Sequence, residues 1–320
     1  MPRANPESHP PVVVVTGPTA TGKTPLAIAL AQRFEGEIVN ADSMQVFRFM
    51  DVGTAKPSLE QRAQVPHHLL DVVTPDVPYS AGRYAEAARA VARDIHGRGK
   101  IPFVTGGTGL YIRAFLEGLI STGAADPALR AQLEREHQQA IAEGDPQRLH
   151  RRLAETDPET AAQVHPNDVR RVTRALEIAQ TTGTAPMQVR AAHGFADRPF
   201  RVLHLALDLD REVLGERIDA RCRAMIEGGL LQELRDLLER GYGPELRPMQ
   251  AIGYRHMIPV AQGSETLANA LTVLRTDTRR FARRQRTWLR AVEGLCWVDP
   301  RDPADIAKRV GEFMDPAPAA

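Results

Sequence analysis

Short apolar runs alternate with amphipathic stretches through the first part of the chain. The first run, 12–15, consists of four valines, and residues 26–31 follow it with the spacing of a helix. Three more apolar runs lie at 37–41, 101–104 and 201–207. Continuous apolar runs of this length are typical of strands buried on both faces, as in a parallel sheet covered by helices. The pattern therefore predicts an α/β core.

Amphipathic periodicity predicts the helices that cover this sheet. From Ser80 to His96 the apolar residues fall on one face, with Ser80 as a suitable N-cap. Further helices are predicted at 210–225 and 230–239, and the segment 249–255 is expected to be a compact loop or a helix start.

The alternation of strand and helix stops between 121 and 198. This segment contains helical patterns at 127–142, 145–155, 158–164 and 168–181. Because no strand pattern interrupts them, we predict an all-helical insertion. The predicted domains are an α/β core in two parts, 1–120 and 199–320, and the insertion at 121–198.

Composition is that of an ordinary soluble globular protein, with 42% hydrophobic and 25% charged residues. No apolar run approaches the roughly 20 residues that span a bilayer, and the first eleven residues lack the apolar core of a signal peptide. Cys222 and Cys296 form no metal-type cluster and indicate no disulfide framework. His67 and His68 are adjacent, so their side chains diverge and do not share a metal. We expect a cytoplasmic protein with a fraying tail after Asp299.

The first predicted strand leads into a phosphate-loop motif. Residues 17–24 match G-x-x-x-x-G-K-[ST] between a strand and a helix, the context that this motif requires. Backbone N–H groups converge there, the positive end of the helix points at the same place, and Lys23 adds a full charge. The Thr24 hydroxyl suits a Mg²⁺ ion that bridges phosphate oxygens. The predicted site for a diphosphate or polyphosphate comprises Gly17, Pro18, Thr19, Ala20, Thr21, Gly22, Lys23 and Thr24.

Polar residues also follow the second and third predicted strands. Asp42-Ser43-Met44-Gln45 ends one strand, and Gly106-Gly107-Thr108-Gly109 ends the other. The carboxyl ends of parallel strands line the ligand crevice, so we expect Asp42 near the phosphate loop. Two alternatives remain, namely an Asx turn or N-cap at Asp42 and a plain tight turn at the glycines.

Positive charge is concentrated near the C-terminus. The chain has a formal net charge of +1, yet the segment 275–290 contains seven arginines and one acid. A helix at 275–292 turns about 100° per residue, which gathers four arginines on one face. This arginine stripe consists of Arg279, Arg283, Arg286 and Arg290. The opposite, docked face is expected to carry Phe281, Trp288, Leu289 and Val292.

Four like charges in a row repel one another, so helix energetics do not favour the arginine stripe. A nucleic acid would offset the repulsion through release of its counterions. The pattern therefore indicates nucleic-acid binding. Neutralisation of the stripe by acids elsewhere in the fold remains the alternative.

Together these motifs closely resemble those of the bacterial tRNA dimethylallyltransferases, also called tRNA isopentenyltransferases. The matching motifs follow one another in the same order as in that family, from about Pro11 to Val298. The matching segments are 17–24, 42–46, 53–57, 106–111, 165–168, 174–177, 252–255 and 284–290. Two residues depart from the family pattern, Phe47 in place of a common tyrosine and Pro25 after the phosphate loop, and neither changes a proposed chemical group.

The resemblance implies a P-loop NTPase-like parallel sheet core with an all-helical insertion domain, and a defined reaction. A dimethylallyl group would pass from dimethylallyl diphosphate to N6 of adenine 37, in tRNAs that read codons beginning with U. Asp42 would take the proton of the amine, Thr108 would help to hold the base, and Arg221 would lie near the diphosphate. Mg²⁺ on Thr24 would assist the departure of diphosphate.

The resemblance also implies that the helical insertion grips the anticodon stem-loop of tRNA. Adenine 37 would leave its stack to enter the site. With the arginine stripe, the expected tRNA contacts are Asp42, Ser43, Met44, Gln45, Thr108, Arg130, Arg170, Arg171, Arg174, Gln250, Ala251, Ile252, Gly253, Tyr254, Arg255, Arg279, Arg283, Arg286 and Arg290. We expect the enzyme to act as a monomer without a membrane partner.

Three other functions compete with this one. A small-molecule P-loop kinase would share the phosphate loop but has little use for the arginine stripe. An adenylate isopentenyltransferase would add the same group to free AMP or ATP, and the helical insertion and basic helix argue against it. A pure RNA-binding module would leave Asp42 and the phosphate loop idle.

Overall fold

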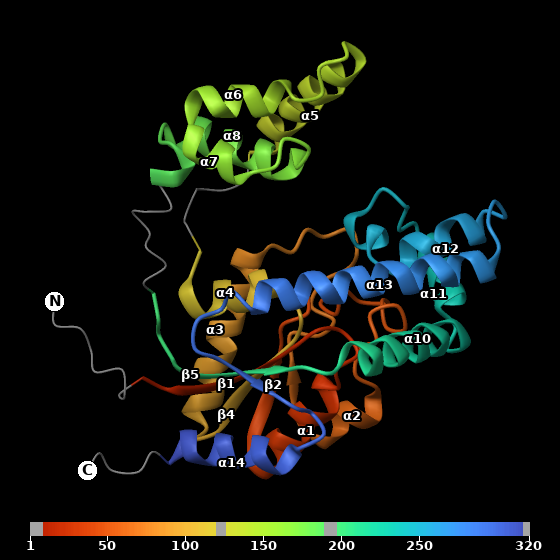
Figure 1. Cartoon of the computed structure of the whole chain (residues 1–320). Coiled ribbons are helices and arrows are strands. Elements are labelled where there is room, and N and C mark those ends of the chain that lie inside the picture. Colours follow the sequence, from red (N-terminus) through yellow and green to blue (C-terminus); the bar gives the residue numbers. More distant parts are fainter. Residues whose placement is uncertain (1–8, 120–125, 189–196, 316–320) are drawn as a thin grey trace. The chain divides into compact units, whose positions relative to one another are not determined.

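The computed structural model describes residues 9–119, 126–188 and 197–315 of the chain. The chain divides into two compact units (Figure 1). The α/β unit comprises Met1–Leu116 and Pro199–Ala320, and the helical unit comprises Glu117–Arg198. Most of the N-terminal lead-in and the predicted start of the insertion at 121 lie outside the described residues.

A six-stranded sheet with the order β3-β2-β4-β1-β5-β6 forms the centre of the α/β unit. Every pairing between its strands is parallel. The strands are β1 Pro11–Thr16, β2 Gly36–Asn40, β3 His67–His68, β4 Ile101–Thr105, β5 Arg201–Leu207 and β6 Leu295–Val298. The four apolar runs of the sequence are the four central strands, so the predicted parallel core is confirmed. The two edge strands were not predicted.

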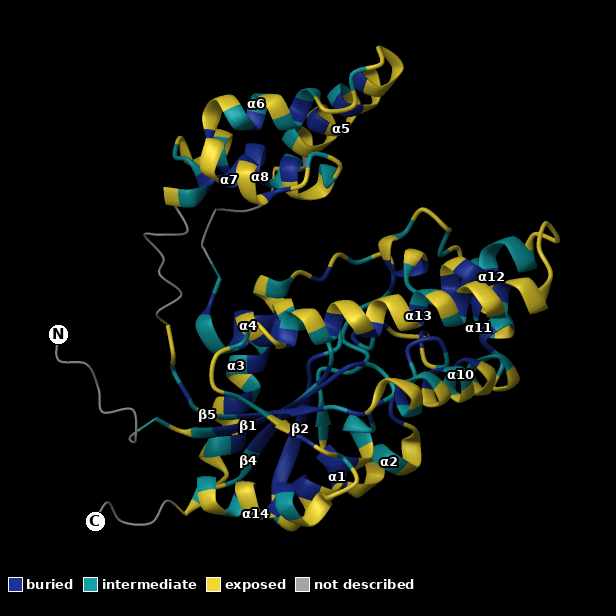
Figure 2. Cartoon of the chain, viewed as in Figure 1, coloured by how far each residue is buried: buried dark blue, intermediate teal, exposed yellow. Residues whose placement is uncertain are grey.

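The valine run explains how the sheet is covered on both sides. Val12 and Val14 pack into one apolar cluster, whereas Val13 and Val15 pack into a second. Alternate side chains of a strand point to opposite faces, so both faces of β1 are buried. The first cluster includes residues of α3 Ala81–Gly97, α4 Gly109–Glu117, α10 Arg211–Glu227 and α11 Leu230–Glu239. The second includes residues of α1 Lys23–Arg33 and α14 Pro303–Met314 (Figure 2).

The expectation that the tail frays after Asp299 is wrong for residues 303–314. These residues form α14, in which Ile306 and Val310 are fully buried. The Asp302 carboxylate accepts a hydrogen bond of 3.0 Å from the Asp305 N–H and caps this helix. Pro303 stands in the first turn, where proline favours a helix start.

The predicted basic helix is longer than expected and begins earlier. It is α13, Leu267–Leu289, and Thr266 caps its first turn. Its buried face consists of Ala270, Leu274, Thr278, Ala282, Gln285 and Leu289. Phe281 is 36% exposed, so its placement on the docked face is wrong, whereas Leu289 is buried as predicted.

Three shorter elements complete the α/β unit in its described part. They are α2 Leu59–Gln64, the 3-10 helix Arg247–Gln250 and α12 Tyr254–Ala261. Of the two alternatives predicted for 249–255, the helix start is observed, because α12 begins at Tyr254. None of the helices in the described ranges is long and apolar enough to cross a membrane.

The helical unit is a separate bundle with its own apolar core. Its helices are α5 Pro127–Ala142, α6 Arg148–Thr156, α7 Pro158–Gln163 and α8 Val169–Thr182. These match the four predicted helical patterns to within three residues. Leu133, Leu149, Leu153, Val172 and Leu176 fill the core between them.

Candidate active site

The phosphate loop joins β1 to α1, as the motif predicts. Gly17 has a φ of 146°, and a Cβ at this position would lie 2.7 Å from the carbonyl oxygen of Leu207. Glycine is therefore required at Gly17 for both conformation and space. Thr21 donates a hydrogen bond of 2.8 Å to the carbonyl oxygen of Pro18, which closes the loop on itself.

Lys23 is the first residue of α1, and its ammonium group is folded back on the loop. Its Nζ donates to the carbonyl oxygens of Gly17 and Pro18, at 3.0 and 2.8 Å. Burial and, to a smaller extent, the positive charge of Arg221 lower the pKa of Lys23, Asp42 opposes both effects, and the result is a pKa of about 7. The loop therefore holds a lysine that gains a proton readily when an anion arrives.

One cavity of about 560 Å³ opens beside the loop and collects most of the predicted residues. The predicted residues that line it are Thr19, Ala20, Gly22, Lys23, Thr24, Asp42, Ser43, Met44, Gln45, Thr108, Arg221, Gln250, Ala251, Ile252 and Arg255. Gly17, Pro18, Thr21, Gly253, Tyr254 and the arginine stripe lie outside its lining. The phosphate loop, Asp42 and Thr108 therefore share one space.

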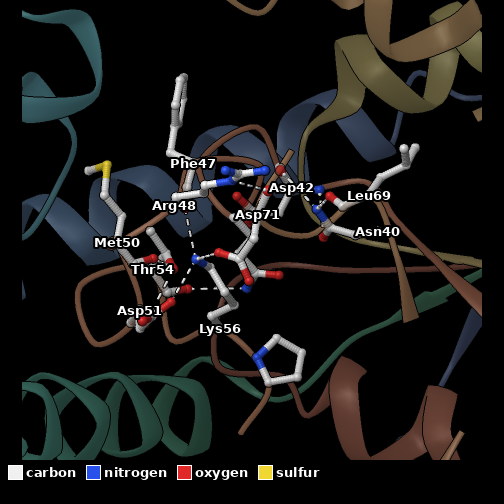
Figure 3. A network of polar contacts seen from close by, with 12 residues as sticks. Asn40, Asp42, Phe47, Arg48, Met50, Asp51, Thr54, Lys56, Leu69 and Asp71 are labelled. Atoms are coloured by element: carbon white, nitrogen blue, oxygen red, sulfur yellow. Dashed lines mark hydrogen bonds and ion pairs between the residues drawn. The ribbon is translucent and has the colours of Figure 1, made fainter. Parts of the chain in front are cut away.

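Asp42 both shapes its loop and faces this cavity. Its Oδ1 accepts the Met44 N–H at 2.8 Å, so the Asx-turn alternative is realised. Asn40 anchors the same loop, because its side chain bonds both the N–H and the carbonyl of Asp42, at 3.1 and 3.2 Å (Figure 3). The Asp42 charge also raises the pKa of Lys23 and Arg221 against the effect of their burial. The carboxylate is thus a turn former within reach of the cations of the site.

Thr108 ties the ends of two strands together. Its Oγ1 accepts the Ser43 N–H at 2.9 Å and donates to the Ser43 hydroxyl at 3.2 Å. Gly106 makes this contact possible, since a Cβ there would lie 2.3 Å from the backbone of Ala41. The turn that the sequence left open as a plain connection therefore positions the Asp42–Gln45 loop.

The loop 51–57 forms another wall of the cavity, and the buried side chain of Lys56 stabilises this loop. The Lys56 ammonium is 1% exposed and contacts Asp51 and Asp71, each at 2.6 Å, and the carbonyl oxygen of Phe47 at 2.8 Å (Figure 3). Gln45 grips the same loop through hydrogen bonds of 3.2 Å to the carbonyl oxygens of Thr54 and Ala55. Lys56 supports this wall and does not line the cavity.

Glu233 of α11 is a supporting residue that the sequence did not reveal. Its carboxylate accepts the N–H groups of Asp51, Val52 and Gly53, at 2.8, 2.7 and 2.9 Å. It also accepts the Tyr254 hydroxyl at 2.6 Å. Tyr254 is fully buried, so its side chain supports the loop 51–57 through Glu233 rather than lying on a contact surface.

Gln285 of α13 is the second residue that sequence reasoning missed. It is a polar residue on the buried face of a helix, where its side chain bonds the phosphate loop and the Gly106–Gly109 turn. A polar residue on a mostly apolar helix face is the signal in the sequence that marks Gln285.

The arginine stripe is only partly free. Arg279 pairs with Asp219 at 2.6 Å, and Arg286 pairs with Asp208. Arg283 and Arg290 are exposed and form no ion pair within the described ranges. Neutralisation by acids of the fold, the alternative left open above, therefore applies to half of the stripe.

Most of the predicted tRNA contacts of the helical unit are also ion-paired. Glu177 is buried and pairs with Arg130 at 3.0 Å and with Arg174 at 2.8 Å. Arg171 pairs with Asp168 at 3.3 Å, whereas Arg170 is exposed. The three paired arginine side chains nevertheless remain exposed on α5 and α8.

The fold and the cavity define a P-loop protein. A parallel sheet presents a phosphate loop, and a carboxylate and a hydroxyl from neighbouring strand ends face the same cavity.

Comparisons with known proteins identify the family. The family model described as IPP transferase matches residues 45–292, and the model described as isopentenyl transferase matches residues 10–70. The chain is 49% identical over 295 residues to a tRNA dimethylallyltransferase of Desulfosudis oleivorans, covering 92% of this chain and 93% of that protein. This chain belongs to the tRNA dimethylallyltransferase family, and the enzymes of that family are prenyltransferases.

Solved structures agree with this assignment. The full-length tRNA isopentenylpyrophosphate transferase of Bacillus halodurans matches with a TM-score of 0.70 and 36% identity, over 96% of this chain and 97% of that one. A eukaryotic dimethylallyltransferase acting on tRNA matches with a TM-score of 0.80 and 31% identity, over 95% of this chain and 79% of that one. The predicted resemblance is confirmed, and a kinase or a pure RNA-binding module does not fit it.

Proposed function

We propose that this protein transfers the dimethylallyl group of dimethylallyl diphosphate to N6 of adenine 37 in tRNAs that read codons beginning with U. The observation that carries this proposal is the single cavity shared by the phosphate loop, Asp42 and Thr108. Transfer of an allylic group needs an anion-binding site for the leaving diphosphate and a base for the incoming amine, and the cavity has both kinds of group.

The leaving group is met by positive charge at the loop. As the C–O bond of the allylic ester breaks, negative charge grows on the diphosphate. Lys23, Arg221 and the converging N–H groups of the loop stabilise it. The Lys23 ammonium then exchanges its contacts with the carbonyl oxygens of Gly17 and Pro18 for contacts with phosphate oxygens.

The protein groups around Thr24 suit a Mg²⁺ ion that is held mainly by the diphosphate of the substrate. Within the described ranges no group of three or more His, Cys, Asp or Glu residues could hold a metal. Mg²⁺ commonly retains several waters and binds through one protein oxygen together with phosphate oxygens, and the Thr24 hydroxyl lines the cavity. When bound there, Mg²⁺ would neutralise charge on the diphosphate.

The acceptor side belongs to Asp42 and Thr108. As the new C–N bond forms, the amine of adenine becomes acidic, and the Asp42 carboxylate takes its proton. Thr108 stands beside Ser43 and can donate its hydroxyl to the base once the base displaces that contact. The Ser43–Gln45 segment lines the route of the flipped base into the cavity.

The partner on this proposal is the anticodon stem-loop. Arg283 and Arg290 of the stripe and Arg170 of the helical unit are exposed guanidinium groups suited to phosphates. The segment 250–255 also lines the cavity with Gln250 and Arg255. We propose that the protein acts as a monomer, and a tRNA substrate implies a cytoplasmic enzyme.

Nucleoside mass analysis tests the proposal. The protein is incubated with unmodified tRNA, dimethylallyl diphosphate and Mg²⁺, and the tRNA is digested to nucleosides. We expect adenosine that carries one added dimethylallyl group, together with an equal amount of diphosphate. Absence of this nucleoside, or prenylated AMP as the main product in a parallel reaction with free AMP, would refute it.

A further inference from the structure

Gln285 bridges two loops that are far apart in the sequence. It lies on the buried face of α13 and is 8% exposed. Its Oε1 accepts the backbone N–H of Thr19 at 2.8 Å, and its Nε2 donates to the carbonyl oxygen of Gly107 at 3.0 Å. One side-chain amide thus satisfies a backbone donor and a backbone acceptor at once.

Both partners belong to the proposed active site. Thr19 lies in the phosphate loop that would hold the diphosphate, and Gly107 precedes Thr108, which would hold the base. Gln285 itself also lines the cavity. The two hydrogen bonds therefore connect the half of the site that holds the donor to the half that holds the acceptor.

The close packing around this bridge leaves no room for a side chain at Gly107 or Gly109. A Cβ at Gly107 would lie 2.3 Å from Nε2 of Gln285, and a Cβ at Gly109 would lie 2.5 Å from the Trp288 ring. Gln285 and Trp288, one helical turn apart on α13, thus both lie close against the backbone of one turn. Neither glycine has a positive φ, so close approach rather than conformation accounts for them.

Only a side chain with both a donor and an acceptor can make this bridge. A carboxylate would accept from Thr19 but would face the carbonyl oxygen of Gly107 with another oxygen. An apolar side chain of equal length would leave both backbone groups without these bonds. The chemistry of glutamine is therefore matched to the two loops.

We propose that Gln285 is a positioning residue that sets the separation between the bound diphosphate ester and the adenine held at Thr108. This inference rests on the proposed prenyl transfer. Reacting atoms must approach to about 3–3.5 Å, and a misplacement of about 1 Å can lower the rate by roughly 10²-fold. Loss of the bridge lowers the rate of transfer within the bound complex and leaves the capture of tRNA unchanged.

The test uses Gln285→Met, which keeps the length of the side chain and removes both polar atoms. We expect its single-turnover transfer rate, with both substrates saturating, to fall by roughly 10- to 100-fold. The KM for tRNA should stay within about 2-fold, because the outer face of α13 is untouched. Gln232→Met, an exposed glutamine replaced in the same way on α11, should match the wild type.

A double-variant cycle tests whether the bridge itself is responsible. Gly107→Ala forces a Cβ against Nε2 of Gln285 and should lower the rate in the same way. Because both changes break one contact, the double variant should be no slower than the slower single variant. Independent, multiplying losses would contradict a shared contact.

Other outcomes separate the inference from the proposed function. A Gln285→Met rate within about 2-fold of the wild type, or a loss that only follows a lower melting temperature or weaker tRNA capture, overturns the positioning role while prenyl transfer stands. If the wild type transfers no prenyl group, the proposed function fails. Calorimetry with Mg²⁺ and inorganic pyrophosphate then tests the bridge alone: weaker binding by Gln285→Met supports its hold on the phosphate loop, and equal binding refutes it.

Discussion

Lys23 brings a titratable charge to the centre of the proposed site. Its pKa of about 7 means that roughly half of the free protein has a neutral lysine at that pH. A bound diphosphate places negative charge beside Nζ and raises the pKa of this group. Binding at higher pH must therefore take up a proton, and affinity is lost as that proton becomes scarcer.

From this linkage we predict that the affinity for diphosphate falls as the pH rises above 7. The slope should approach about one tenfold loss per pH unit and should end only when the pH reaches the pKa of the bound state. Calorimetry at several pH values measures it. Lys23→Met provides the reference for ionisation of the ligand itself, and an identical pH dependence in both proteins would contradict the assignment.

Asp42 has two functions that one substitution can separate. In Asp42→Asn the Oδ1 atom remains and still accepts the Met44 N–H, so the turn is preserved. The base is lost, and we expect the transfer rate to drop by roughly 10² to 10⁴-fold with tRNA affinity unchanged. Single-turnover kinetics and filter binding measure the two effects. A rate within a few-fold of the wild type would exclude Asp42 as the proton acceptor.

The residues that the sequence reveals act through groups adjacent in the chain, whereas those that it does not reveal act through partners far away in the chain. The phosphate loop acts through consecutive backbone groups, so its chemistry is visible in eight adjacent letters. Glu233 and Gln285 act through partners about 180 and 266 residues away, and nothing local marks them. Their roles follow from packing, which only the folded chain displays.

Three backbone N–H groups of the loop 51–57 donate to one carboxylate, that of Glu233. Glu233→Gln replaces one acceptor oxygen by an NH₂ group that faces backbone N–H donors. We predict a loss of about 1–3 kcal/mol in the free energy of unfolding, because the partly buried N–H groups of Val52 and Gly53 and the buried Tyr254 hydroxyl share this acceptor. The KM for tRNA should also rise, since this loop forms a wall of the cavity.

Denaturant unfolding and steady-state kinetics check the Glu233 prediction. Glu239→Gln removes the same charge from an exposed position of the same helix and should change stability by less than about 0.5 kcal/mol. Equal effects of the two substitutions would show that the hydrogen bonds of Glu233 add nothing beyond its charge.

The exposed arginines on the outer face of α13 lead to a separate prediction about how the affinity for tRNA depends on salt concentration. Arg283 and Arg290 are the stripe members without an ion pair within the described ranges, so they are the ones free to meet phosphates. Each phosphate contact contributes roughly 0.7 to 0.9 to the slope of log affinity against log salt concentration. The double variant Arg283→Gln, Arg290→Gln should therefore flatten the slope for tRNA by about 1.5.

A charge-matched variant controls the salt experiment. Lys308→Gln with Arg309→Gln removes two charges from α14, which takes no part in the proposed tRNA surface. Its salt slope should match that of the wild type. If the stripe variant keeps the wild-type slope as well, the tRNA path does not follow α13.

Elements were predictable where their pattern was local and strong. The central strands are continuous apolar runs, and α3 begins at its predicted cap. The edge strand β3 has only two residues, and a strand so short has no period to detect. In α14 the proline that suggested fraying is the residue that starts the helix.

The site depends on two parts of the chain that are distant in sequence. Residues 17–108 supply the phosphate loop, Asp42 and Thr108, and residues 221–285 supply Arg221, Arg255 and Gln285. The helical unit lies between these parts in the sequence. The motifs revealed the family because they keep their order along the chain, whereas the cavity that joins them required the fold.

A comparison of acceptors tests whether this one cavity prenylates adenine 37 of an intact tRNA. Labelled dimethylallyl diphosphate and Mg²⁺ are supplied with a tRNA that reads a codon beginning with U, the same tRNA with guanine at position 37, or AMP. We predict label on the first acceptor alone, up to one dimethylallyl group per tRNA. Equal labelling of the guanine variant, comparable kcat/KM for AMP, or no label on tRNA would contradict it.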